Sequence, residues 1–99
     1  MPVLSSVSKA LKLLDAFTAE KPELSLSELA RLAGAHKSSA FRLLGTLEAH
    51  GFVEKNGRTR GYRLGWKIGE LAGRLLARYD LRDLASPYME ELAQRTGEI

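Results

Sequence analysis

Residues 37–42 hold the side chains best suited to bind a ligand without forming a covalent bond. They comprise two cations, two hydroxyl groups and one aromatic ring: Lys37, Arg42, Ser38, Ser39 and Phe41. Cations and hydroxyls donate hydrogen bonds to phosphate oxygens and to the edges of bases. The Phe41 ring has two alternatives, contact with a thymine methyl group or packing back against the edge of the core. The set therefore indicates recognition of a nucleic acid.

Two short helices joined by a tight turn must position this set, within residues 25–50. Ser25 is a good N-cap, and Glu28 can close a capping box over the first amides. Gly34 supplies the turn, because a residue without a Cβ takes the positive φ that a helix C-cap usually needs. The second helix then has a core stripe at i, i+3, i+4 and i+7: Ala40, Leu43, Leu44 and Leu47. Most of the 37–42 set faces away from that stripe, as in a helix that enters the DNA major groove. Helical hairpins of ordinary all-α proteins are the alternative, since they use the same turn.

A β-hairpin is predicted after this pair of helices. Residues 52–55 and 62–64 are strand-like and flank Asn56-Gly57, a strong turn signal. A two-stranded hairpin is marginal alone, so it must pack on the helices through its apolar residues: Phe52, Val53, Tyr62 and Leu64. Its tip carries Arg58 and Arg60, which we expect to contact the DNA backbone or the adjacent minor groove. The alternative is that these two arginines only keep a loop tip soluble.

Residues 5–20 are predicted to form the first helix, with apolar residues at helical spacing. Ser5 or Ser6 can cap it, and Lys21-Pro22 ends it because proline cannot continue a helix. This helix is expected to be a scaffold for the next two. Its outer face carries Lys9 and Lys12, which either reach a phosphate or are simply solvated.

Helical spacing returns from Gly65 to Arg78, with a long apolar stripe: Ile68, Leu71, Ala72, Leu75, Leu76 and Tyr79. An exposed stripe of this length usually marks a partner surface, most simply the same helix of a second subunit. A neighbouring domain of the same chain is the alternative. Trp66 is expected to anchor the helix on the hairpin or to join the partner contact. A last helix is predicted from Ser86-Pro87 to Thr96-Gly97, and its apolar face indicates the start of a truncated domain.

The 99 residues carry a net charge of +3, and their positive charge is concentrated. Residues 36–67 hold seven basic side chains and two acidic ones. A basic band that coincides with the proposed reading helix favours a polyanionic partner, although a solvated charged face is the alternative.

Catalysis is not expected from this composition. The chain has no cysteine and only His36 and His50, so no metal-ligand cluster and no nucleophile–base pair can be recognised. We therefore expect no enzyme activity, no metal site and no cofactor. No run of residues approaches the length of a transmembrane helix, and the N-terminus lacks the features of a secretory signal. A cytoplasmic protein without a membrane partner is expected.

Four segments together resemble the IclR-type bacterial transcriptional regulators: SVSKALKLLDAF, LSLSELARLAGAHKSSAFRLLGTLEAHGFVEK, GYRLGWKIGELA and DLRDLASPYMEELAQRTGEI. The resemblance covers essentially the whole chain. It implies a mainly α fold with a small β-hairpin, that is, a winged helix-turn-helix with a three-helix core plus wing, followed by a linker helix. The implied domains are a DNA-binding domain over 1–65, a linker or dimerisation helix over 66–85, and the start of a truncated effector-binding domain over 86–99.

Carried over by position, the groove-facing residues of the family fall on Lys37, Ser38, Ser39 and Arg42, and those of the wing on Arg58 and Arg60. Three residues depart from the family pattern. His36 stands where proline or serine is more usual, Ala35 replaces a larger aliphatic residue, and Phe41 replaces a polar one.

The resulting expectation is a homodimer or tetramer that places two reading helices in successive major grooves of a pseudo-palindromic operator. Such a protein is a repressor or an activator, and a small-molecule effector acts only through the missing C-terminal domain. The alternative is a winged-helix module that binds proteins or RNA without sequence-specific DNA recognition.

Overall fold

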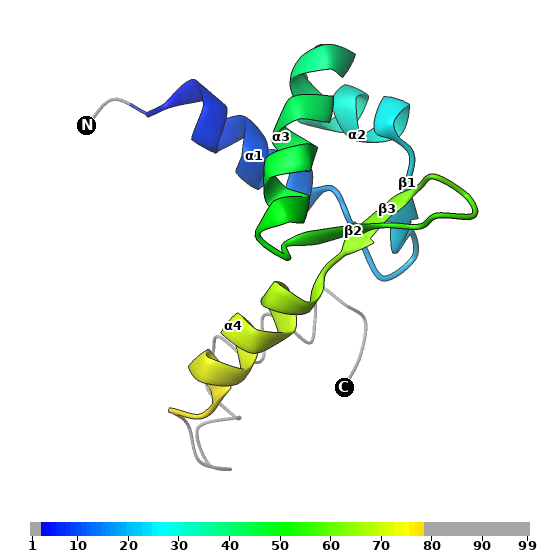
Figure 1. Ribbon diagram of the computed structural model, residues 1–99. Helices are drawn as coiled ribbons and strands as arrows, with labels where there is room; N and C mark the ends of the chain where they lie inside the picture. Colours follow the sequence, from blue (N-terminus) through cyan, green and yellow to red (C-terminus); the bar gives the residue numbers. More distant parts are fainter. Residues whose placement is uncertain (1–2, 79–99) are drawn as a thin grey trace. The chain divides into compact units, whose positions relative to one another are not determined.

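The computed structural model describes residues 3–78 of the chain (Figure 1). Within this range the elements are α1 (Ser5–Asp15), β1 (Glu23–Leu24), α2 (Leu26–Ala33), α3 (Lys37–Ala49), β2 (Val53–Lys55), β3 (Tyr62–Leu64) and α4 (Trp66–Leu76). The chain divides into two compact units, residues 1–68 and 69–99. The predicted three-helix core followed by a hairpin and a further helix is confirmed.

The signals predicted at both ends of α2 are present. The Ser25 Oγ accepts a hydrogen bond from the Glu28 N–H at 3.1 Å, and Glu28 Oε1 accepts one from the Ser25 N–H at 2.9 Å. This is a complete capping box, which satisfies amides that have no partner within the helix. At the other end, Gly34 has a φ of 65° and ends the helix in the left-handed region. Local sequence therefore fixes where α2 begins and where the chain turns toward α3.

The core lies where α1, α2 and α3 meet each other and the sheet (Figure 1). Its buried members among the described residues are Leu13, Leu24, Leu29, Ala30, Ala33, Ala40, Leu44, Val53 and Tyr62. The three alanines lie on α2 and α3, and their small side chains allow two helices to approach closely. The predicted stripe of α3 is confirmed, since Ala40 and Leu44 are buried and Leu43 and Leu47 pack against them.

The sheet has a strand that the sequence analysis did not predict. Its order is β1-β3-β2, with both pairs antiparallel, so the hairpin strand β3 lies between β2 and β1. Leu24 is opposite Tyr62 in one pair, and Val53 is opposite Leu64 in the other. β1 has only two residues, too few for a strand pattern to be recognised. It ties the hairpin to the segment that leads into α2.

The first helix begins at Ser5 as predicted, but its end and its N-cap differ from the prediction. α1 ends at Asp15 with Ala16 as its C-cap, five residues before the predicted end. Beyond it Thr18 and Lys21 close a turn, in which the Lys21 N–H donates to Thr18 Oγ1 at 3.0 Å. At the N-terminus the cap residue is Leu4, without a side-chain hydrogen bond, so Ser5 and Ser6 are not the cap.

Two further expectations need correction. Leu64 is 40% exposed and contributes less to docking the hairpin than predicted, because it is the last residue of its strand. α4 spans Trp66–Leu76, slightly shorter than the predicted 65–78. Tyr79, the rest of the predicted linker and the predicted last helix lie outside the described residues.

α4 starts directly against the C-terminal end of α3. The Gly65 N–H donates to Phe52 O at 2.8 Å, and the Lys67 N–H donates to Gly51 O at 2.9 Å. Gly51 has a φ of 81°, and a Cβ built on it would lie 2.5 Å from Cε2 of Trp66. The Trp66 ring therefore packs over Gly51, in the segment that joins α3 to β2.

Substitution of Gly51 by alanine is expected to destabilise the chain, by about 1–3 kcal/mol for the backbone conformation alone. The new methyl group would also displace the indole ring. Urea unfolding measures the change, and the matched control is Gly57→Ala, where a Cβ would meet no atom within 4 Å. Equal stability of the two variants would contradict this packing.

The capping box also predicts a pH dependence. The Lys21 ammonium, 2.5 Å from Glu28 Oε2, and the hydrogen bonds from Ser25 lower the pKa of Glu28 from 4.5 to about 2. Since the folded pKa is the lower one, the stabilisation is complete above about pH 4.5 and disappears as the pH falls toward 2. Glu28→Gln keeps the capping acceptor and removes the charge. We expect its Tm to lie below that of the wild type at neutral pH and to converge with it between pH 4.5 and 2.

The control for this titration is Glu48→Gln, which removes the charge of an exposed glutamate on α3. A Tm difference between the wild type and Glu28→Gln that is the same at pH 7 and pH 2 would show that the charge of Glu28 is not the cause.

Candidate nucleic-acid interface

The exposed face of α3 carries most of the predicted reading residues. Lys37, Ser38, Phe41 and Arg42 are exposed, and Ser39 is half-buried toward α1. Ala40 and Leu44 are buried on the opposite side of the same helix. A helix held by one face leaves the donors of the other face available to a ligand. The structure thus gathers these residues on one surface, and their contact with DNA remains a prediction.

The start of α3 has no side-chain cap. His36 is its N-cap, in extended conformation with φ −67° and ψ 149°, and its imidazole makes no capping hydrogen bond. A serine or aspartate here would accept from the amides of the first turn. The departure at His36 noted in the sequence therefore leaves the first turn of α3, which begins with Lys37, without that support.

Phe41 does not fold into the core. It is 53% exposed, and the Lys55 Nζ lies 5.9 Å from the centroid of its ring. The same ammonium is 5.5 Å from the centroid of the Tyr62 ring. Cation–π contacts of this kind hold a lysine over aromatic faces, so Lys55 joins α3 to strands β2 and β3. Sequence reasoning counted Lys55 only within the basic band, and its place between two rings had no local signal.

The tip of the hairpin is an organised loop. Asn56 Oδ1 accepts from the Arg58 N–H at 2.9 Å, and Asn56 O accepts from the Arg60 N–H at 2.8 Å. Arg60 has a φ of 64°, which non-glycine residues adopt only at a cost. The two arginine side chains are exposed. They stand on a loop whose backbone is fixed by Asn56 rather than on a free loop.

Glu23 of β1 is a further residue that the sequence analysis missed. Its carboxylate accepts from Thr59 Oγ1 at 2.7 Å and from Asn56 Nδ2 at 3.0 Å. These hydrogen bonds, from Thr59 first and Asn56 second, lower the pKa of Glu23. The acid thus connects the segment before α2 with the tip of the hairpin. Its partners are 33 and 36 residues away in sequence, which no spacing rule could have revealed.

The predicted dimerisation stripe is only partly described. Leu71, Ala72 and Leu76 are exposed, and Ile68 and Leu75 are half-buried. No described residue of α4 is buried. A role of this stripe in dimerisation remains a prediction, and Tyr79 lies outside the described range.

The part of the chain between residues 3 and 78 has neither a metal-binding cluster of side chains nor a membrane-spanning helix. This part of the chain holds no group of three or more His, Cys, Asp or Glu side chains that could bind a metal ion. None of its helices is long and apolar enough to cross a membrane.

Comparison with known proteins gives consistent matches. The family model of the IclR helix-turn-helix domain matches residues 6–57. The transcriptional regulator XynR of Escherichia coli K12 is 37% identical over 98 residues, which is 99% of this chain and 39% of that protein. The regulator KipR of Bacillus subtilis is 38% identical over 94% of this chain and 36% of its own length.

Solved structures agree with the sequence matches. An IclR-type regulator from Silicibacter sp. TM1040 has a TM-score of 0.74 at 38% identity, covering 95% of this chain and 37% of that one. An IclR homologue from Microbacterium hydrocarbonoxydans, complexed with 4-hydroxybenzoate, has a TM-score of 0.68 at 30% identity, covering 92% and 38%. The chain therefore spans well under half the length of these relatives. With its helix-turn-helix, its wing and a domain match over more than half of its residues, the chain belongs to the IclR helix-turn-helix family.

Proposed function

We propose that this chain is the operator-reading part of a transcriptional regulator and binds double-stranded DNA sequence-specifically. The observation that supports this most is the exposed face of α3, which offers Lys37, Ser38 and Arg42 beside an arginine-bearing wing. Membership in the IclR helix-turn-helix family supports the same function.

In this proposal α3 enters the major groove. Some side chains contact base edges and others contact backbone phosphates. Arg42 donates two hydrogen bonds to the O6 and N7 of a guanine, and Ser38 and Ser39 donate to bases or phosphates. Lys37, Arg58 and Arg60 bind phosphates and set the register of the protein on the duplex. Two copies would bind the two halves of a pseudo-palindromic site.

The remaining functions belong to the whole protein and are proposals as well. The stripe on α4 would join two subunits in a dimer or tetramer, and a small molecule would control a repressor or activator in the cytoplasm through a domain outside these 99 residues. The complex of the Microbacterium hydrocarbonoxydans homologue with 4-hydroxybenzoate is the precedent for such an effector.

Replacement of Arg42 by alanine should weaken binding of the preferred duplex by about 1–3 kcal/mol and relax selectivity at one base pair. Lys37→Ala should instead weaken binding to all sequences equally and flatten the salt dependence, because a phosphate contact carries no sequence information. Fluorescence titrations with the preferred and a scrambled duplex measure both. Equal losses of affinity on the two duplexes for Arg42→Ala would contradict its base-reading role.

The wing can be tested without disturbing the fold. Arg60→Gly removes the guanidinium and suits the φ of 64°, so we expect stability to be retained. Loss of one phosphate contact should reduce the slope of log K against log salt by about 0.9. The control is Arg74→Gln, which removes an exposed charge on α4. Glutamine is used there because a glycine would weaken the helix. An unchanged slope for Arg60→Gly would remove the wing tip from the interface.

Selection of duplexes from a random pool tests the function itself. A two-fold consensus with half-sites about one helical turn apart supports a dimeric reader. A single enriched half-site keeps DNA reading and removes dimerisation from these 99 residues. No enrichment, with binding only at very low salt, would favour the protein-interaction or RNA-binding module.

A further inference from the structure

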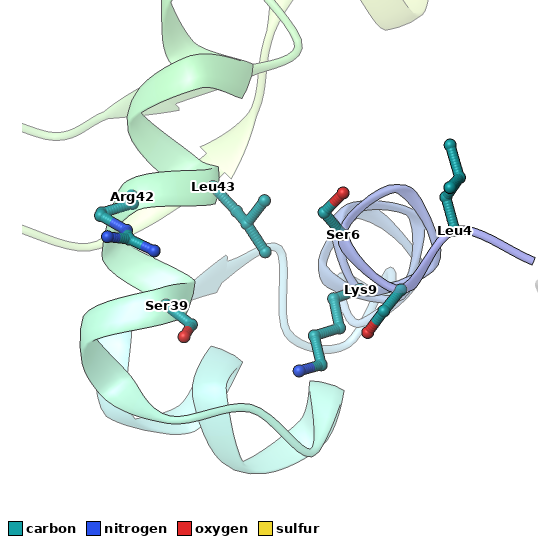
Figure 2. Close-up of a pocket in the computed structure, with 7 residues that line it drawn as sticks. Leu4, Ser6, Lys9, Ser39, Arg42 and Leu43 are labelled. Atoms are coloured by element: carbon teal, nitrogen blue, oxygen red, sulfur yellow. The ribbon is translucent and has the colours of Figure 1, made fainter.

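An open cleft with a mixed polar and apolar lining lies beside the exposed face of α3, between the N-terminal half of α1 and α3. It has a volume of about 420 Å³, and its walls carry three hydroxyls and two cations from the two helices: Ser5, Ser6, Lys9, Ser39 and Arg42. Figure 2 shows the Lys9 side chain projecting from α1 into the space between the helices, with Ser39 and Arg42 on α3 across that space. None of the described residues that line the cleft is acidic.

These groups match the chemistry of one anionic ligand, a phosphate. Ammonium and guanidinium groups and hydroxyls are all donors, and a phosphodiester offers only acceptor oxygens with one negative charge. With no carboxylate among the described lining residues, nothing in the wall of the cleft neutralises its two cations. The apolar part of the lining comes from Leu4 and Leu43, and the donors of the five polar residues lie beside it.

Lys9 is better prepared for this role than a typical surface lysine. Lys9 as a residue is half-buried and lines the cleft, whereas Lys12, three residues further on the same helix, is exposed and does not line it. A lysine whose stem already packs on the protein has less rotamer freedom to lose when its ammonium binds. The structure thus separates the two lysines, which the sequence presented as equivalent.

The position of the cleft beside α3 indicates that its phosphate belongs to the DNA backbone. Ser39 and Arg42 belong to α3, so the cleft adjoins the face that is proposed to enter the major groove, while Lys55 and the wing adjoin α3 through Phe41. A helix in the major groove has a sugar–phosphate strand on each side. The wing would meet one of these strands, and on the α1 side this cleft offers two cations and three hydroxyls to the other.

We propose that the cleft between α1 and α3 is a seat for one DNA backbone phosphate, with Lys9 as its principal cation and Ser6 and Ser39 as hydroxyl donors. Arg42 forms its wall and adds positive charge, so that the same residue borders both the phosphate seat and the base edges. The inference rests on the proposed DNA-reading function and makes α1 part of the interface rather than only its scaffold.

The matched pair Lys9→Gln and Lys12→Gln tests the seat in the 99-residue chain, on the duplex that the wild type selects. Glutamine retains most of the packed stem and removes the charge, and circular dichroism verifies that both variants fold. We expect Lys9→Gln to lower affinity on the order of tenfold at 50 mM salt and to reduce the slope of log K against log salt by about 0.9. Lys12→Gln should leave both unchanged, and Lys9→Arg should restore the slope.

A second measurement locates the contact. Each backbone phosphate of the duplex is replaced in turn by a neutral methylphosphonate. At one position per half-site the wild type should lose as much affinity as Lys9→Gln does, and there Lys9→Gln should lose nothing further. A loss for Lys9→Gln that persists undiminished at every position would overturn a localised seat.

The remaining outcomes separate the two proposals. If Lys9→Gln binds like the wild type while Arg42→Ala loses base selectivity, the seat is wrong and DNA reading stands. If the wild type enriches no duplex, the proposed function fails first. A free phosphate has the same oxygens. Saturable binding of inorganic phosphate to the DNA-free chain, lost in Lys9→Gln without a change in DNA affinity, would therefore overturn the DNA assignment.

Discussion

The structure depends on burying one side of α3 while leaving the other side bare. Ala40 and Leu44 are fully buried among Leu13 of α1 and Leu29 of α2, and the small side chains between α2 and α3 let these helices lie close together. Such packing fixes the rotation of α3 about its own axis, because a different rotation would expose the leucine and bury charged groups. The direction in which Arg42 points therefore follows from the apolar contacts on the far side of the helix.

Local signals in the sequence were sufficient for the parts of the fold that local chemistry determines. The capping box of Ser25 and Glu28, the left-handed Gly34 and the Asn56-Gly57 turn each act within a few residues, so their spacing could be recognised. The features that were missed are pairings between distant residues. β1 forms because Glu23 and Leu24 pair with β3. The position of Lys55 depends on its contacts with the rings of Phe41 and Tyr62. The end of α1 was missed because tertiary contacts and a turn at Thr18 outweigh helical propensity.

The same distinction applies to the candidate site. The face of α3 could be predicted from its 3.6-residue period, because that period alone separates core from surface. The residues on either side of this face could not be predicted, because they belong to other helices and strands. Glu23 fixes the wing tip from a segment more than thirty residues away, and Lys9 of α1 lines the same cleft as Ser39 of α3 (Figure 2). Sequence alone placed Lys9 and Lys12 together on one polar face, and only the packing of α1 against α3 distinguishes them.

The contact between Gly51 and Trp66 has a mechanical consequence. The start of α4 is attached to the segment that follows α3 by two backbone hydrogen bonds and by the Trp66 indole ring, which packs directly on Gly51. These contacts are close and leave little room for the ring or the backbone to move. The end of α3 and the residues Trp66–Ile68 at the start of α4 belong to the same compact unit, so the start of α4 cannot change direction relative to α3 without breaking these contacts.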